Sequence, residues 1–474
     1  MLLKYFYDRA LAQASYLVGC QATGEAIVID PARDIEPYLE AAAQEGVRIV
    51  AAAETHIHAD FVSGSRELAA RVGARLYLSG MGGSEWAYAF AGPDDVLLQE
   101  GSAFMIGNLR FEALHTPGHT PEHVIFQLTD TAAADRPMGL FTGDCLFVGD
   151  IGRPDLLETA VGMLGSAEVG ARGQFANMQR LRAMPDYLQV WPGHGAGSAC
   201  GKALGAVPSS TLGYEKLFNP AFQFDDQDAF VRWLLDGQPE TPRYFAQMKK
   251  VNREGPALLD DLPSIEMLEG FILPDLLRQR LLVIDARSAD EFAYAHIPGT
   301  LNIPPSSSFN TYAGWFVRYN EPTYLIAPEA AVPALVKQLR AIGVDHIPGY
   351  FPPDQVEGLT ETLPVISVRE AAERLADSHA ILLDVRAHSE YLSQRIDGAR
   401  NIMYGVLPRH LDELPKDLPI IVVCASGARS QIAASLLQMH GFQEVMNMAG
   451  GLNAWLAEGL PVIEGLGEGE PSAG

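Results

Sequence analysis

The chain has 474 residues, enough for about three domains at roughly 150 residues each. Hydrophobic residues make up 48% of the chain and charged residues 20%, which excludes a mainly disordered protein. The formal net charge of −25 argues against nucleic acid or an anionic membrane as a partner. Small anionic substrates would therefore need local positive sites.

Cysteine usage indicates the cellular compartment. The four cysteines are too few and too scattered for a disulfide framework, which predicts a reducing compartment, the cytoplasm. They are Cys20, Cys145, Cys200 and Cys424. Because Lys4, Asp8 and Arg9 interrupt the apolar N-terminus and no apolar run reaches the 18 residues of a spanning helix, we expect neither a signal peptide nor a membrane anchor.

The first half of the chain alternates predicted strands and helices. Short apolar runs predict strands, and 35–44 is expected to be a helix. The predicted strands are 16–18, 26–30, 76–78, 104–114 and 124–128. We therefore predict one α/β domain over 1–245. Residues 246–263, which include Lys249, Lys250 and paired acidic residues, are expected to form a polar linker.

The second half contains an internal repeat. Residues 282–303 align with 381–402 at a constant offset of 99, and each copy begins with a short apolar run that predicts a buried parallel strand. We predict two α/β domains with parallel sheets, over 264–358 and 364–464. A short linker is expected near 355–363, and the Gly- and Glu-rich tail 465–474 is expected to be disordered.

Four segments of the first domain carry potential metal ligands. Thr55–Phe61 reads THIHADF and follows the apolar segment 47–53, so its polar side chains should emerge at a strand end. His115–His123, Phe141–Phe147 and Trp191–Gly195 add further histidines and Asp144. A hard or borderline metal prefers such a mixture of imidazole and carboxylate ligands.

These four segments resemble the metallo-β-lactamase superfamily, which implies an αββα sandwich. Phe61 replaces the histidine that binds a second metal in the binuclear hydrolases, so the sequence resembles the persulfide dioxygenase branch. This resemblance implies one Fe(II) per chain in a facial triad with open positions. By motif position, the implied iron ligands are His56, His119 and Asp144. The groups implied to orient ligands or water are His58, Asp60 and His194.

Two residues near these motifs are candidates for substrate contacts. Arg153 lies in a segment that is also similar to the dioxygenase branch, and it could hold the anionic end of a thiol substrate. Cys200, six residues after His194, could approach the iron or carry sulfur. The alternatives are a surface arginine and a small buried cysteine.

The last domain contains a candidate nucleophile. The strand 420–423 leads through Cys424 into a loop and a helix, an arrangement that directs backbone N–H groups at the sulfur and stabilises a thiolate. The loop residues are Ala425, Ser426, Gly427, Ala428, Arg429 and Ser430. The spacing C-x4-R is one residue shorter than the phosphatase cradle C-x5-R, which suits a sulfur atom.

This loop resembles the rhodanese family, as do Asp384 and Arg386 in the opening motif DVR. The implied mechanism is acceptance of sulfane sulfur by the Cys424 thiolate and its removal by sulfite or a thiol. The middle domain keeps the opening motif at Asp285 and Arg287 but has no cysteine. We interpret it as a degenerate rhodanese repeat that spaces the active domains or forms an interface.

The combination predicts a bifunctional enzyme that oxygenates low-molecular-weight persulfides with O₂ to sulfite and a thiol, and exchanges sulfur with thiosulfate. Tethering would raise the local concentration of sulfite. One alternative is a binuclear zinc thioester hydrolase, since zinc has no redox chemistry. Another is a non-enzymatic persulfide sensor or sulfur-delivery scaffold. The resemblance implies a homodimer or homotetramer, whereas the carrier thiol and the net direction of sulfur transfer stay open.

Overall fold

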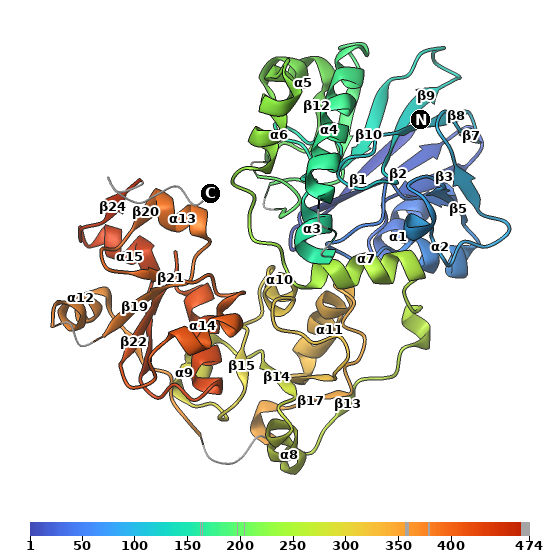
Figure 1. Cartoon of the computed structure of the whole chain (residues 1–474). Helices are drawn as coiled ribbons and strands as arrows, with labels where there is room; N and C mark the ends of the chain where they lie inside the picture. Colours follow the sequence, from blue (N-terminus) through green and yellow to red (C-terminus); the bar gives the residue numbers. More distant parts are fainter. Residues whose placement is uncertain are drawn as a thin grey trace. The chain divides into compact units, whose positions relative to one another are not determined.

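The computed structural model describes residues 1–161, 163, 165–196, 198–202, 204–355, 360–377 and 380–465. The chain divides into two compact units (Figure 1). The first comprises Met1–Leu262 with Leu339–Gly343, and the second comprises Pro263–Gln338 with Val344–Gly474. Each unit is described by itself below.

Two six-stranded sheets form the centre of the first unit. The first sheet has the order β1 (Leu2–Asp8), β2 (Gln13–Cys20), β3 (Glu25–Ile29), β4 (Arg48–Ala53), β5 (Arg75–Ser79) and β6 (Val96–Leu98). The second has the order β12 (Ser210–Thr211), β11 (Gln189–Pro192), β10 (Gly139–Gly143), β9 (Val124–Asp130), β8 (Leu109–His115) and β7 (Ala103–Ile106). Side chains such as Tyr16, Phe111 and Phe141 fill the space between the sheets.

Helices cover the outer face of each sheet. On the first sheet, α1 (Glu36–Glu45) and α2 (Ser65–Val72) bury Tyr38 and Leu68 in a second core. On the second sheet, α4 (Ser166–Arg182) and α6 (Gln227–Leu235) bury Met178 and Phe230 in a third. This arrangement confirms the predicted αββα sandwich. Helices α3 (Leu156–Val161) and α5 (Leu212–Phe218) also belong to this unit.

Two predictions for the first unit are wrong in detail. The single strand expected at 104–114 is a hairpin of β7 and β8, which turns at Gly107 with a φ of 55°. The linker expected at 246–263 begins instead with helix α7 (Tyr244–Glu254), which belongs to the first unit. This helix buries one face, including Phe245, Met248 and Asn252, so its lysine pair belongs to an amphipathic helix.

The second unit contains two five-stranded parallel sheets of matching order. The first is β13 (Glu266–Met267), β17 (Gly349–Phe351), β16 (Thr323–Ile326), β14 (Leu282–Asp285) and β15 (Leu301–Asn302). The second is β18 (Val365–Ile366), β23 (Val445–Met448), β22 (Ile420–Val423), β19 (Ile381–Asp384) and β21 (Arg400–Asn401). The equal topology agrees with the repeat that the sequence predicts.

Short helices complete the two repeats. The first repeat has α8 (Leu273–Arg278), α9 (Ala289–Tyr294), α10 (Phe309–Ala313) and α11 (Val332–Ala341). The second has α12 (Val368–Ala376), α13 (His388–Ser393), α14 (Ala428–Met439), α15 (Gly451–Ala457) and the antiparallel pair of β20 (Gln394–Arg395) with β24 (Ile463–Glu464). Apart from Gly465, the tail expected to be disordered lies outside the described residues.

The two repeats of the second unit contact each other. The Gln431 side-chain amide donates a hydrogen bond to Asn302 Oδ1 at 3.0 Å, and the Asn302 backbone N–H donates to Ser435 Oγ at 3.1 Å. Aromatic rings extend this contact, because the Tyr312 and Trp315 centroids lie 5.8 Å and 6.1 Å from that of Tyr404. The middle domain therefore forms an interface with the last one, as one of the two predicted roles requires.

Within the described residues, no helix combines the length and the apolar character needed to cross a bilayer. All four cysteines are buried and none forms a disulfide.

Candidate functional site

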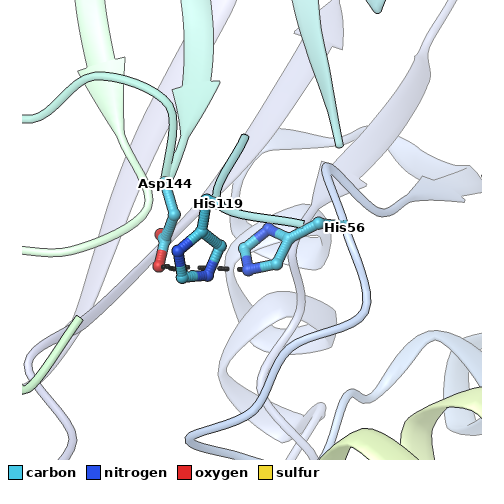
Figure 2. A group of neighbouring side chains, drawn as sticks. All are labelled: His56, His119 and Asp144. Carbon is cyan, nitrogen blue, oxygen red and sulfur yellow. Dashed lines mark ion pairs between the residues drawn. The ribbon is translucent and has the colours of Figure 1, made fainter. Parts of the chain in front are cut away.

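Three side chains from separate loops meet at the ends of β4, β8 and β10. His56, His119 and Asp144 are at most 1% exposed, and one potential ligand atom from each lies within 4.8 Å of the others (Figure 2). Asp144 Oδ2 lies 3.9 Å from His56 Nε2 and 3.5 Å from His119 Nε2. These three atoms have no hydrogen-bond partner in the described part of the chain. Because buried polar atoms are normally paired, three such atoms this close together fit a bound cation.

Each triad residue makes a further hydrogen bond through an atom that is not the potential metal ligand. The other ring nitrogen of His56 pairs with Thr55 Oγ1 at 3.0 Å, and His119 Nδ1 donates to the Arg153 carbonyl at 2.9 Å. The Asp144 backbone N–H donates to His123 Nε2 at 3.0 Å. The sequence analysis did not select His123, although it is the last residue of the motif that supplies His119. These contacts fix the ring orientations, as metal-ligating histidines require.

Electrostatics favours a cation at the triad. Burial, with the neighbouring histidines, lowers the pKa of His56 well below its usual value, and burial lowers the pKa of His119 to about 4. Burial opposes ionisation of Asp144, but charged His194 and other imidazoles lower its pKa overall. Neutral imidazoles beside a carboxylate are the donor set of a 2-His-1-carboxylate metal site, so these residues fit one iron or zinc ion.

A second group of potential ligands adjoins the triad and comprises Asp60, His194 and Cys200. Both nitrogens of His194 are engaged, with Asp60 Oδ2 at 2.5 Å and Asp144 Oδ1 at 2.7 Å. Burial lowers the pKa of His194, but these carboxylates outweigh it and raise the pKa to about 10. A doubly protonated His194 orients Asp144 and has no lone pair for a metal.

Cys200 is the third member of this group. Its thiol is 1% exposed, and burial together with Asp60 and Asp144 raises its pKa well above the ordinary value. The thiol is therefore protonated while no cation is close.

His58 and Phe61 lie on another side of the centre. His58 Nε2 lies 3.1 Å from Asp30 Oδ1 and 3.3 Å from Glu54 Oε2, which raises its pKa well above the usual value despite burial. Phe61 is 1% exposed, and its ring centroid lies 4.4 Å from that of His58. The Phe61 ring thus packs against His58 and has no lone pair to offer a metal.

The Arg153 guanidinium is engaged by other protein groups, whereas the expected role in substrate binding requires a free donor. Its guanidinium is buried and makes two hydrogen bonds to Asp155, at 2.8 Å and 2.6 Å. The other donors contact Thr241 and the carbonyls of Ala199 and Pro239. Since every N–H has a partner, Arg153 fixes this loop and offers no free donor to an anion. Substrate binding by Arg153 stays a prediction without support from this geometry.

The second candidate centre is the loop between β22 and α14. Cys424 is 1% exposed, and its sulfur accepts hydrogen bonds from the Gly427 backbone N–H at 3.1 Å and from the Ser430 hydroxyl at 3.4 Å. Gly427 has a φ of 100°, which only glycine adopts readily. Ala425, Ser426 and Ala428 complete the loop, whose helix N-terminus favours an anionic sulfur.

One ion pair holds Arg429 of this loop, and a second one lies within the opening motif of the domain. Arg429 pairs with Glu390 through two contacts of 2.6 Å and 2.9 Å. Asp384 binds Arg386 in the same two-pronged manner, and the Arg386 guanidinium also donates to the Gln394 carbonyl at 2.7 Å. This geometry assigns Glu390 to positioning Arg429.

Comparison with known proteins identifies a family for each of the two regions that carry these sites. The metallo-β-lactamase superfamily profile matches residues 8–194, and the rhodanese-like domain profile matches residues 367–458. The chain therefore belongs to the metallo-β-lactamase superfamily and carries a C-terminal rhodanese domain. More particularly, it has the composition of a persulfide dioxygenase–rhodanese fusion.

Three curated relatives illustrate this composition. Human persulfide dioxygenase ETHE1 is 31% identical over 157 residues, which cover 33% of this chain and 56% of that protein. Hydroxyacylglutathione hydrolase of Rhodospirillum rubrum is 34% identical over 179 residues, which cover 38% and 60%. A sulfurtransferase of Allochromatium vinosum is 35% identical over 99 residues, which cover 21% and 92%. The matched region thus spans less than two thirds of the first two proteins.

A crystal structure of a metallo-β-lactamase from Staphylococcus aureus subsp. aureus COL has a similar fold. The two chains are 44% identical with a TM-score of 0.67, and the match covers 74% of this chain and 98% of the other. The similarity therefore extends beyond the first domain into the second half of the chain.

Proposed function

We propose that the chain is a bifunctional enzyme of sulfur metabolism, an iron persulfide dioxygenase joined to a sulfurtransferase. The observation that carries the first activity is the buried triad of unpaired ligand atoms beside Phe61. The relatives named persulfide dioxygenase and sulfurtransferase support an enzyme that acts on persulfides and related sulfur compounds.

In the first reaction a persulfide, dioxygen and water give a thiol, sulfite and two protons. Ferrous iron held by His56, His119 and Asp144 would supply open positions for sulfur and dioxygen. Thr55, the Arg153 carbonyl and His123 keep these ligands oriented, while Phe61 keeps one side of the site apolar. Analysis of products in air and under argon tests this activity, because sulfite should appear only in air.

In the second reaction the Cys424 thiolate attacks the sulfane sulfur of thiosulfate, breaks its S–S bond and releases sulfite. The persulfide formed on Cys424 then passes its outer sulfur to a thiol or, in reverse, to sulfite. The Gly427 N–H and the helix N-terminus stabilise the negative sulfur, and Arg429 contributes positive charge at the rim. Both reactions share sulfite, so fusion favours its transfer between the sites.

A Glu390→Gln substitution is expected to slow sulfur transfer roughly tenfold, because it removes the charge that fixes Arg429 in a two-pronged pair. Steady-state cyanide-dependent thiocyanate formation measures this effect. Glu370→Gln is the matched control, since Glu370 pairs with Arg374 on the exposed face of α12. Equal rates for wild type and Glu390→Gln would contradict the positioning role.

The second candidate function is a binuclear zinc thioester hydrolase. It is favoured by the adjoining group Asp60, His194 and Cys200 and by the relatives named hydroxyacylglutathione hydrolase. Against it, both His194 nitrogens are engaged and Phe61 provides no lone pair. Two zinc ions per chain with oxygen-independent thioester cleavage would favour the hydrolase. If the chain were instead a non-enzymatic sulfur-delivery scaffold, removal of the metal would leave its function unchanged. A cytoplasmic location and a dimer or tetramer stay predictions.

A further inference from the structure

Three amide side chains, those of Asn302, Gln431 and Asn447, form a hydrogen-bond relay within the second unit, from the middle domain to the Cys424 loop. The Gln431 side-chain N–H donates to Asn302 Oδ1 at 3.0 Å, and the Asn447 side-chain N–H donates to Gln431 Oε1 at 3.0 Å. The Ser430 hydroxyl then donates to Asn447 Oδ1 at 2.7 Å and lies 3.4 Å from the Cys424 sulfur. All five side chains are buried. The relay therefore connects the degenerate repeat to the nucleophile of the last domain.

The direction of the relay is set in the middle domain. The Asn302 side-chain N–H₂ donates to the carbonyls of Asp285 at 2.9 Å and Arg287 at 3.2 Å, so Oδ1 is the atom that faces the last domain. Asn401, its counterpart at the offset of 99, donates to the equivalent carbonyls of its own repeat, so this pair of bonds belongs to the repeat. The contact of Asn302 Oδ1 with Gln431 is the additional feature. Because a backbone carbonyl can only accept, these bonds determine which atom of each amide in the relay donates.

Ser430 is the residue at which the relay meets the reacting sulfur. A hydroxyl donates one hydrogen, and the two acceptors beside it are Asn447 Oδ1 and the Cys424 sulfur. The Asn447 amide is itself held, because its N–H₂ donates to Gln431 Oε1 and, at 3.4 Å, to the Gly427 carbonyl. The Ser430 oxygen therefore stays beside the sulfur, where its proton can turn towards a negative charge that forms there.

We propose that the degenerate repeat is part of the sulfurtransferase site, because Asn302 holds the Ser430 hydroxyl beside the Cys424 sulfur through the relay. This inference rests on the proposed sulfurtransferase function. The hydroxyl stabilises the negative sulfur that attacks thiosulfate, and again the negative sulfur that is left when the persulfide gives up its outer atom. Asn302 and Gln431 are thus positioning residues, and the middle domain has a role in sulfur transfer beyond the interface that it forms.

The reactivity of Cys424 tests this role without repeated turnover. Mass spectrometry of the complete chain gives the rate at which thiosulfate loads sulfur onto Cys424 and the rate at which iodoacetamide alkylates it. A Gln431→Met variant, whose side chain has a similar length but cannot donate, is expected to slow both reactions roughly fivefold. The matched control is Gln438→Met on the same helix, because Gln438 donates to the Thr362 carbonyl and is not part of the relay. This control should react at the rate of the wild type.

A double-mutant cycle with Ser430→Ala separates positioning from a general structural effect. If Gln431 acts through Ser430, adding Gln431→Met to Ser430→Ala causes no further loss, whereas an independent structural effect is added in full. Asn302→Ala cuts the relay at its other end, is expected to give the same pattern, and serves as the test if Gln431→Met does not fold. Unchanged rates in both variants, or full additivity with Ser430→Ala, would overturn the proposal. If thiosulfate fails to load the wild type while alkylation depends on the relay as expected, only the sulfurtransferase assignment is wrong.

Discussion

A Cys424→Ser variant is expected to lose sulfur transfer from thiosulfate by at least roughly a thousandfold, because serine cannot form a persulfide. Its dioxygen consumption with a persulfide should change by less than about twofold, since the metal triad lies in the other compact unit. Thiocyanate formation in the presence of cyanide measures the transfer, and an oxygen electrode measures the consumption.

Cys20→Ser serves as the control for this prediction. Cys20 is also a buried thiol, but it lies in β2, where its sulfur accepts a hydrogen bond from the Asn108 backbone N–H at 3.3 Å. The control should retain both activities. Transfer that survives in Cys424→Ser would show that another thiol carries the sulfur and would remove the role assigned to the loop at the N-terminus of α14.

A His119→Ala variant is expected to lose bound metal and at least roughly a thousandfold of the dioxygen consumption, because it removes one of three ligands. Sulfur transfer should persist. Elemental analysis of protein dialysed against a weak chelator gives the metal content, and the oxygen electrode gives the activity. Full metal content in this variant would mean that the ion is held elsewhere.

The same motif supplies the matched control. His115→Ala removes a histidine only four residues from His119, but His115 is half-buried and its ring contacts the Pro121 carbonyl at 2.8 Å, away from the triad. We expect one metal ion per chain and nearly unchanged oxygen consumption in that control. Loss of metal in both variants would indicate general destabilisation of the loop and not ligand removal.

The features that could be predicted from the sequence depend on local pattern. His56, His119 and Asp144 each belong to a local motif that follows the end of a strand. The triad could therefore be predicted from these motifs without knowledge of the sheet order. The Cys424 loop is likewise continuous in sequence, and its strand and helix had clear patterns. The repeat at an offset of 99 also predicted two sheets of one topology, as the strand orders agree.

The features that escaped prediction depend on contacts between distant segments. The helix α7 was taken for a linker because its lysine pair and the following glycine and proline outweighed a short apolar face. That face is recognisable only when Asn252 is seen to donate hydrogen bonds to the His58 and Phe61 carbonyls. Arg153 was predicted to bind substrate, whereas its five hydrogen bonds go to four residues in three segments of the chain. Sequence spacing cannot reveal such pairings.

The most direct test of the account is oxygen uptake by the complete chain, loaded anaerobically with ferrous iron and then given a low-molecular-weight persulfide. The account predicts one dioxygen consumed for each sulfite released, with thiosulfate appearing when a sulfane-sulfur donor is present and Cys424 is intact. Absence of oxygen uptake in protein that holds one iron per chain would contradict the dioxygenase and would make thioester hydrolysis the leading activity.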